Sequence, residues 1–351
     1  MLDNAMLDNG WQYTQSLWEV FHNTVFLGQT LKSTEIVPQP AQCFKIHVPN
    51  GGELATATEF FLASSHDHPC AGLDWIVLLY LFLVVHCCSW FSRWLVWEPF
   101  ARWRLGVSSN CGDATTKRKI ENFSQSVNAA SFHILSSIFV WRILSQKEWL
   151  WSTEAWGDPT ALSSIEPDFK FYYLLYAARY ISDMLSLYYE NKRSDTLAYA
   201  IHHVATVALV LLSGHVGLTR VGGVIMFFFD WTDPFMLIAK ALVYLSRKPT
   251  DIYQWLADRL FELFAVSFFL TRNLMFSCVV YVVFQYDFND YPEIPATAAF
   301  ILKSMLIVLE LLMTFWLVLI IKAAINQLSN EGNVEDIRED EFTTTKKKKG
   351  I

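Results

Sequence analysis

Seven long apolar runs constrain the fold of this 351-residue chain more than any other feature of its sequence. A helix needs roughly 20 predominantly apolar residues to cross the hydrocarbon core of a bilayer. Polar residues interrupt the second and third runs, which are the weakest. The runs cover residues 75–97, 123–144, 171–189, 197–213, 221–245, 260–284 and 297–321. We therefore predict an all-α fold, a multi-pass membrane helix bundle with about seven transmembrane helices.

Composition supports a membrane protein and argues against several other classes. Hydrophobic residues make up 53% of the chain and charged residues only 17%, against about 25% charged residues in an average soluble domain. The formal net charge of -7 disfavours a nucleic-acid-binding protein, which is normally basic. The chain contains no P-loop, GxSxG, HExxH or CxxC sequence, so we predict neither a metal site nor a cofactor.

Lysine and arginine residues gather in alternate connections between the runs, which gives the orientation. Ten fall in residues 98–122, 190–196 and 246–259, and only three fall in residues 145–170, 214–220 and 285–296. Because such a bias marks the cytoplasmic side of a membrane, we expect the first connection to be cytosolic. Seven spans then place the N-terminus in the lumen and the C-terminus in the cytosol.

Ionisable residues inside the fourth and fifth runs are candidates for a functional site. The fourth run contains His202 and His203, and the fifth contains Asp230, Asp233 and Lys240. A charged side chain at the centre of a spanning helix costs about 2.5–3.5 kcal/mol on insertion scales, so such residues usually pair or line a cavity. The three-residue spacing places both carboxylates on one helix face, to which Lys240 returns.

Two interpretations of these residues remain open at this point. In the structural one, the carboxylates pair with Lys240 or with Arg272 of the sixth run, and the histidines pack as hydrogen-bonded core residues. In the catalytic one, an imidazole acts near neutral pH and an aspartate orients it. A rise of about 1.5 Å per residue puts His202 and Asp233 about 10 Å apart in depth. Direct pairing therefore requires a tilted helix, a break at Pro234 or different helix boundaries.

The order of these residues resembles the ceramide synthases, membrane acyltransferases with a TLC domain. The resemblance covers residues 117–320. It is carried by Lys192-Arg193-Ser194-Asp195, His202-His203-Val204-Ala205-Thr206, Arg220-Val221-Gly222, Asp230-Trp231-Thr232-Asp233 and Lys240, with Lys170-Phe171-Tyr172-Tyr173-Leu174-Leu175 upstream and Thr271-Arg272 downstream. Three positions depart from the family pattern: Phe229 replaces a histidine, Thr232 a serine and Leu237 a glutamate.

The resemblance implies that a fatty acyl group passes from acyl-CoA, the co-substrate, to the amine of a sphingoid base. It implies catalytic roles for His202, His203, Asp230 and Asp233. One histidine would act as the base or accept the acyl group, and the carboxylates would orient the imidazole. It implies substrate-binding roles for four basic residues, and further cations at the cytosolic mouth could attract the CoA phosphates. The binding residues are Lys192, Arg193, Lys240 and Arg272, and the further cations are Arg247 and Lys248.

The resemblance also divides the chain into parts. We expect a luminal N-terminal segment (1–74), a first transmembrane helix (75–97), a basic cytosolic linker (98–122), a TLC-like catalytic domain with six transmembrane helices (117–322) and a charged cytosolic tail (323–351). The partners would be acyl-CoA, sphingoid base and membrane lipid, with a homo-oligomer or hetero-oligomer left open.

Two further features bear on localisation. The final residues Lys348-Lys349-Gly350-Ile351 resemble a dilysine signal for return to the endoplasmic reticulum, although a solvated charged tail is an equal alternative. Cys43 and Cys70 could form a luminal disulfide or remain two thiols.

Two rival functions are compatible with the same sequence. A non-enzymatic TLC-domain protein could bind lipids or assist translocation without needing the histidines. A transporter would fit Gly222-Gly223 and Pro234 as helix breaks near the midplane, but the expected internal repeat is not detected.

Overall fold

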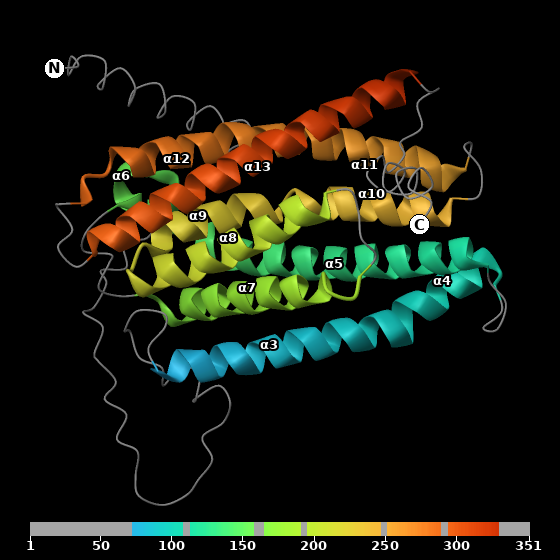
Figure 1. The fold of residues 1–351 in the computed structure, drawn as a ribbon, viewed down its shortest axis with the longest axis horizontal. Helices are drawn as coiled ribbons and strands as arrows, with labels where there is room; N and C mark the ends of the chain where they lie inside the picture. The colour runs from blue at the N-terminus through green and yellow to red at the C-terminus, as the bar shows by residue number, and fades with distance from the viewer. Residues whose placement is uncertain are drawn as a thin grey trace, which may run out of the picture.

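The computed structural model describes residues 72–107, 113–157, 165–190, 195–246, 251–288 and 294–329, and the regular structure in these ranges is helical throughout. The long helices lie side by side and run alternately in opposite directions along the longest axis of the molecule (Figure 1). The predicted all-α helix bundle is confirmed.

The helices follow the order of the predicted apolar runs. They are α3 (Gly72–Ser92), α4 (Glu98–Leu105), α5 (Ala114–Leu144), α6 (Thr153–Trp156), α7 (Pro167–Ser186), α8 (Thr196–His215), α9 (Thr219–Asp230), α10 (Asp233–Leu245), α11 (Ile252–Phe268), α12 (Phe276–Gln285) and α13 (Ala296–Ser329). Two π-helical segments, η1 (Arg93–Trp97) and η4 (Phe269–Met275), join α3 to α4 and α11 to α12, and the short 3-10 helix η2 (Glu148–Trp151) precedes α6.

Six continuous helical stretches among the described residues are long and apolar enough to cross a membrane. They are Asp74–Leu105, Ala114–Leu144, Thr196–His215, Thr219–Leu245, Ile252–Gln285 and Ala296–Gln327. The remaining predicted span is α7, which has 20 residues but carries Asp168, Lys170, Arg179 and Asp183. This helix packs against α3 and α8, and most of its residues are buried. It can therefore keep charged side chains inside the bundle rather than facing lipid.

Helix ends differ from the predicted boundaries on the side expected to be cytosolic. The predicted linker 98–122 contains α4, which continues the first span to Leu105, and the first turns of α5 from Ala114. The predicted tail from residue 323 begins within α13, which ends at Ser329. At these places the helices extend past the apolar runs, because polar residues continue α4, α5 and α13.

Capping and turn residues explain where several helices start and stop. Asp113 caps α5 by accepting a hydrogen bond from the Thr116 amide over 3.0 Å, and hydrogen bonds from Thr116 lower the pKa of this exposed carboxyl. Gly106 ends α4 in the left-handed region, with φ of 68°. Pro234 lies in the first turn of α10 and lacks an amide donor, which fits the break between α9 and α10.

A buried ion pair joins the first span to the rest of the bundle. The Lys170 ammonium of α7 lies 3.0 Å from the Asp74 carboxylate at the start of α3. The two side chains are only 5% and 1% exposed. Burial of both ions is costly unless they remain together, so each ion stays there only because the other does.

We predict that Asp74→Ala lowers the free energy of unfolding by about 3–5 kcal/mol, since the Lys170 ammonium stays buried after its counter-ion is removed. Glu166→Ala is the control, because it removes a more exposed pair with Lys147 and should cost no more than about 1 kcal/mol. Denaturant titration of both variants in detergent micelles checks this. Equal losses in the two variants would contradict the role given to the buried pair.

Candidate active site

The two adjacent histidines of α8 are buried among aromatic rings. His202 and His203 are 5% and 2% exposed. The His203 ring meets Tyr199 edge to face at a centroid distance of 4.3 Å, and His202 meets Trp316 of α13 at 5.3 Å. The Nδ1 atom of His202 is buried without a hydrogen-bond partner in the ranges that the structure describes. One imidazole nitrogen of His202 therefore has an unused capacity for a hydrogen bond.

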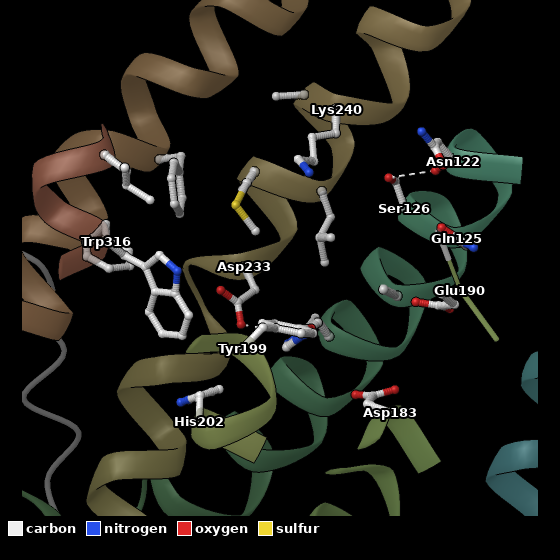
Figure 2. A pocket seen from close by; sticks show the side chains of 18 of the residues that line it. Asn122, Gln125, Ser126, Asp183, Glu190, Tyr199, His202, Asp233, Lys240 and Trp316 are labelled. Carbon is white, nitrogen blue, oxygen red and sulfur yellow. Dashed lines mark hydrogen bonds and ion pairs between the residues drawn. The ribbon is translucent and has the colours of Figure 1, made fainter. Parts of the chain in front are cut away.

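The histidine pair lines a cavity of about 260 Å³. Three other residues predicted for the site, Asp233, Lys240 and Arg272, line the same cavity. Figure 2 shows His202 of α8, Asp233 and Lys240 of α10 and Trp316 of α13 around this space. The structure thus brings together side chains that are up to 70 positions apart in the sequence, from His202 to Arg272.

Asp230 lies behind the cavity wall and is fully buried, at 0% exposed. Its Oδ2 accepts a hydrogen bond from the Tyr172 hydroxyl over 2.9 Å and another from the Ser136 hydroxyl. Its Oδ1 accepts from Nη2 of Arg179 over 3.1 Å. Ser137 donates to the backbone carbonyl of Asp230 over 2.9 Å. Asp230 therefore ties the end of α9 to both α5 and α7.

His133 of α5 connects the two carboxylates. Its Nδ1 lies 3.3 Å from Oδ1 of Asp230, and its Nε2 lies 3.5 Å from Oδ2 of Asp233. Nη1 of Arg179 also lies 3.3 Å from Nδ1. His133 lines the cavity and is 12% exposed. The break between α9 and α10 lets the two aspartates approach one imidazole from consecutive helices.

We predicted that Asp230 and Asp233 would contact the α8 histidines. This prediction is wrong, because the imidazole that both carboxylates contact is that of His133 in α5. The ion pairs and hydrogen bonds of both carboxylates go to His133, Arg179, Arg272 and neighbouring hydroxyls. The depth difference between His202 and Asp233 is the physical reason, because these side chains start from different levels of their helices.

Arg272 is a buried cation that contacts the junction between α9 and α10. It lies in the π-helical segment η4, and its Nη2 is 2.8 Å from Oδ1 of Asp233. The same side chain donates to the Thr232 hydroxyl over 3.3 Å and to the Phe229 carbonyl over 2.9 Å. Arg272 is also within electrostatic range of His202. One buried guanidinium therefore pairs with Asp233 and also acts electrostatically on His202.

Of the remaining predicted binding residues, the structure describes Lys240 but not Lys192 or Arg193. Lys240 lines the cavity. Lys192, Arg193, Arg247 and Lys248 lie outside the described residues, as do Cys43, Cys70 and the terminal lysines. In the described ranges, no group of three or more His, Cys, Asp or Glu side chains is placed to hold a metal ion.

A second, apolar cavity of about 60 Å³ lies further along α8. Thr206, Val210 and Ser213 of α8 line it, together with side chains of α7, α9, α12 and α13. Tyr180 lines the first cavity and Tyr176 the second, and their hydroxyls are 3.2 Å apart. This tyrosine pair lies between a polar cavity that contains the histidines and a smaller apolar one.

The TLC-domain family model matches residues 122–322, which is more than half of the chain. The chain belongs to the TLC-domain family. The matched range begins in α5, ends in α13 and includes both cavities apart from Ser89 and Ala323 at the rim of the larger one. The α8 histidines, both aspartates and His133 all lie inside it.

Individual relatives of this TLC-domain protein include plant and fungal proteins. Alternaria stem canker resistance protein 1 of Solanum lycopersicum is 26% identical over 303 residues, which cover 78% of this chain and 96% of that protein. Ceramide synthase LOH2 of Arabidopsis thaliana is 26% identical, with 70% of this chain and 84% of the relative covered. Sphingosine N-acyltransferase lag1 of Schizosaccharomyces pombe is 30% identical, with 50% and 46% covered.

Sequence reasoning missed His133, Arg179, Tyr172 and Ser136 as parts of this TLC-domain site. A signal for them exists, because the second and third apolar runs are the ones that polar residues interrupt. In α5, His133 and Ser136 are three residues apart and share a helix face. The interruptions that weaken these runs as membrane spans are the side chains that hold Asp230.

We predict that Asp230→Ala lowers the free energy of unfolding by about 3–5 kcal/mol, because Arg179 remains buried without its carboxylate. Asp168→Ala is the matched control, since it removes an exposed carboxylate in the first turn of α7 and should change the midpoint little. Thermal unfolding in micelles measures both. A midpoint unchanged by Asp230→Ala would show that Asp230 does not hold α5, α7 and α9 together.

Proposed function

We propose that this TLC-domain protein is a ceramide synthase that transfers a fatty acyl group from acyl-CoA to the amine of a sphingoid base. The observation that carries the proposal is the buried His202–His203 pair on the wall of a cavity that also contains Asp233 and Arg272. The names of several relatives, ceramide synthase and sphingosine N-acyltransferase, support the same reaction.

The Nδ1 atom of His202, which has no hydrogen-bond partner among the described residues, favours a nucleophilic role for this residue. In this route, a neutral imidazole nitrogen attacks the thioester carbon, the C–S bond breaks and CoA leaves as its thiolate. The amine then attacks the acyl-imidazole, the amide C–N bond forms and His202 is released. The Arg272 guanidinium supplies positive charge on the cavity wall, where it can stabilise the oxyanion that develops on the acyl carbonyl.

The two cavities suggest how the acyl-CoA is placed. Lys240 and Lys322 line the first cavity, and Lys322 lies near the end of α13 that is expected to be cytosolic. Cations there can attract CoA phosphates, as can Lys192, Arg193, Arg247 and Lys248 in the neighbouring connections. The apolar cavity beyond Tyr176 is suited to part of the acyl tail, because its lining is almost wholly hydrocarbon.

We place the protein in the endoplasmic reticulum membrane, with a luminal N-terminus and a cytosolic C-terminus. The alternating Lys and Arg content of the connections supports this orientation.

A second candidate is a TLC-domain protein that binds lipid without transferring an acyl group. The observation that favours it is the loss of two family side chains close to the carboxylates, where this chain has Phe229 and Leu237. Such a protein would bind acyl-CoA or sphingoid base in the same cavity and form no amide.

We predict that the purified full chain forms ceramide from labelled acyl-CoA and sphingoid base. The double variant His202→Ala, His203→Ala should lose at least about 100-fold in kcat/KM, because no remaining group replaces an imidazole at this position. His215→Ala is the control, since His215 is an exposed histidine at the other end of α8. Binding without product by the unmodified chain would favour the second candidate, and a loss of only a few fold would remove the histidines from the mechanism.

A further inference from the structure

Asp183 presents a carboxylate to the larger cavity from the α7 side. It is a cavity-lining residue, and Figure 2 shows it in a different part of the cavity wall from His202. Its side chain has no hydrogen bond or ion pair to any residue that the structure describes. It lies within electrostatic range of Arg179 and His133. A carboxylate in a membrane bundle is costly unless a cation compensates it, so this position suits a cationic ligand.

The fixed charges around Asp183 do not compensate it fully. Asp183, Asp230 and Asp233 are three carboxylates that share the neighbourhood of His133, and the guanidiniums there are Arg179 and Arg272. Arg179 forms a direct ion pair with Asp230, and Arg272 forms one with Asp233. Lys240 lines the same cavity, seven residues beyond Asp233 on α10. The two guanidiniums form their ion pairs with Asp230 and Asp233, so Asp183 is the carboxylate of this cluster without an arginine partner among the described residues.

A second observation shows that the same cavity is built for a ligand. His202 is 5% exposed, lines the cavity and leaves its Nδ1 atom without a partner in the described part of the chain. A buried imidazole nitrogen without a partner loses hydrogen-bond energy that a bound molecule can restore. His202 and Asp183 therefore offer two different polar groups, one on α8 and one on α7, to whatever occupies the cavity.

We propose that Asp183 binds the protonated amine of the sphingoid base and that His133 accepts the proton which this amine must lose. This inference rests on the proposed acyltransferase function and adds to it the position of the second substrate. Asp230 and Asp233 contact His133 from α9 and α10, so this proton acceptor has two carboxylates that orient its ring.

The proton transfer keeps the charge of the cluster constant. The ammonium gives one proton to an imidazole nitrogen of His133, which yields a neutral amine and an imidazolium. The amine lone pair then attacks the acyl carbon, the amide C–N bond forms and the bond to the leaving group breaks. The leaving group takes the electron pair of the broken bond and then the second amine proton. It is CoA thiolate in direct transfer, or the His202 imidazole whose own proton has already gone to the departed thiolate. His133 returns its proton to water after product leaves.

The polar wall beside Asp183 fits the rest of the same substrate. Ser126, Asn122 and Gln125 of α5 and Glu190, four residues beyond the end of α7, line this part of the cavity (Figure 2). Hydroxyl and amide groups suit the hydroxyl groups of a sphingoid base, which lie next to its amine. The amine would thus reach the acyl carbon from the α7 side while the acyl group lies on the α8 side.

The steady-state kinetics of Asp183→Asn test the binding part of this inference. The variant should raise KM for the sphingoid base about 10- to 100-fold, the range for loss of one hydrogen bond to a charged group, and leave KM for acyl-CoA unchanged. Asp168→Asn is the matched control, because it makes the same change on an exposed residue in the first turn of α7. An unchanged KM for the base would overturn the inference.

The pH dependence of His133→Gln tests the proton acceptor. At pH 7 the variant should lose about 100-fold in kcat, and the deficit should shrink as the pH rises, because solvent deprotonates the amine instead. Arg179, Asp183, Asp230, Asp233 and Arg272 are the charged groups that surround this position. A deficit that is constant from pH 6.5 to pH 9 would mean that His133 only positions the carboxylates. If His133→Gln does not fold, Asp183→Asn still decides whether the amine binds here.

The unmodified chain separates failure of this inference from failure of the proposed function. If it forms no ceramide, the acyltransferase proposal fails first. If it forms ceramide and Asp183→Asn behaves like Asp168→Asn, the reaction stands and the amine site is overturned.

Discussion

The buried charge of Asp230 is the constraint on which the rest of the site depends. A carboxylate that is 0% exposed inside a membrane bundle must be neutralised by protein, and here a guanidinium, a phenol, a hydroxyl and an imidazole do so. These donors come from α5 and α7, while Asp230 ends α9. Satisfying one charge therefore fixes the relative positions of three helices, and with them the start of α10, where Asp233 faces the cavity.

Because Asp230 fixes α5, α7 and α9 in this way, the histidines on the cavity wall have two different surroundings. The α8 histidines lie among the rings of Tyr180, Tyr199 and Trp316. His133 lies instead between two carboxylates, which hold its ring from α9 and α10. The two histidine environments differ, and they suit two different tasks, acyl acceptance at one and proton acceptance at the other.

The sequence predicted the bundle and much of the cavity wall, because apolar length and intramembrane charge are local signals. The runs matched helices, and His202, His203, Asp233, Lys240 and Arg272 line one cavity. Which groups pair could not be predicted, because pairing depends on helix depth and on the break between Asp230 and Asp233. His133 and Arg179 were missed because they lie in the two most polar runs. Polar residues there were interpreted as evidence for a weak membrane span and not as parts of a site.

A structure of the full chain with a non-hydrolysable acyl-CoA analogue and a sphingoid base, determined by cryo-electron microscopy, tests the central claim most directly. The account predicts the acyl carbonyl beside His202, the tail directed towards the apolar cavity and the amine nitrogen within hydrogen-bond distance of Asp183 and His133. An acyl chain lying outside the bundle, or a carbonyl remote from His202, would contradict it.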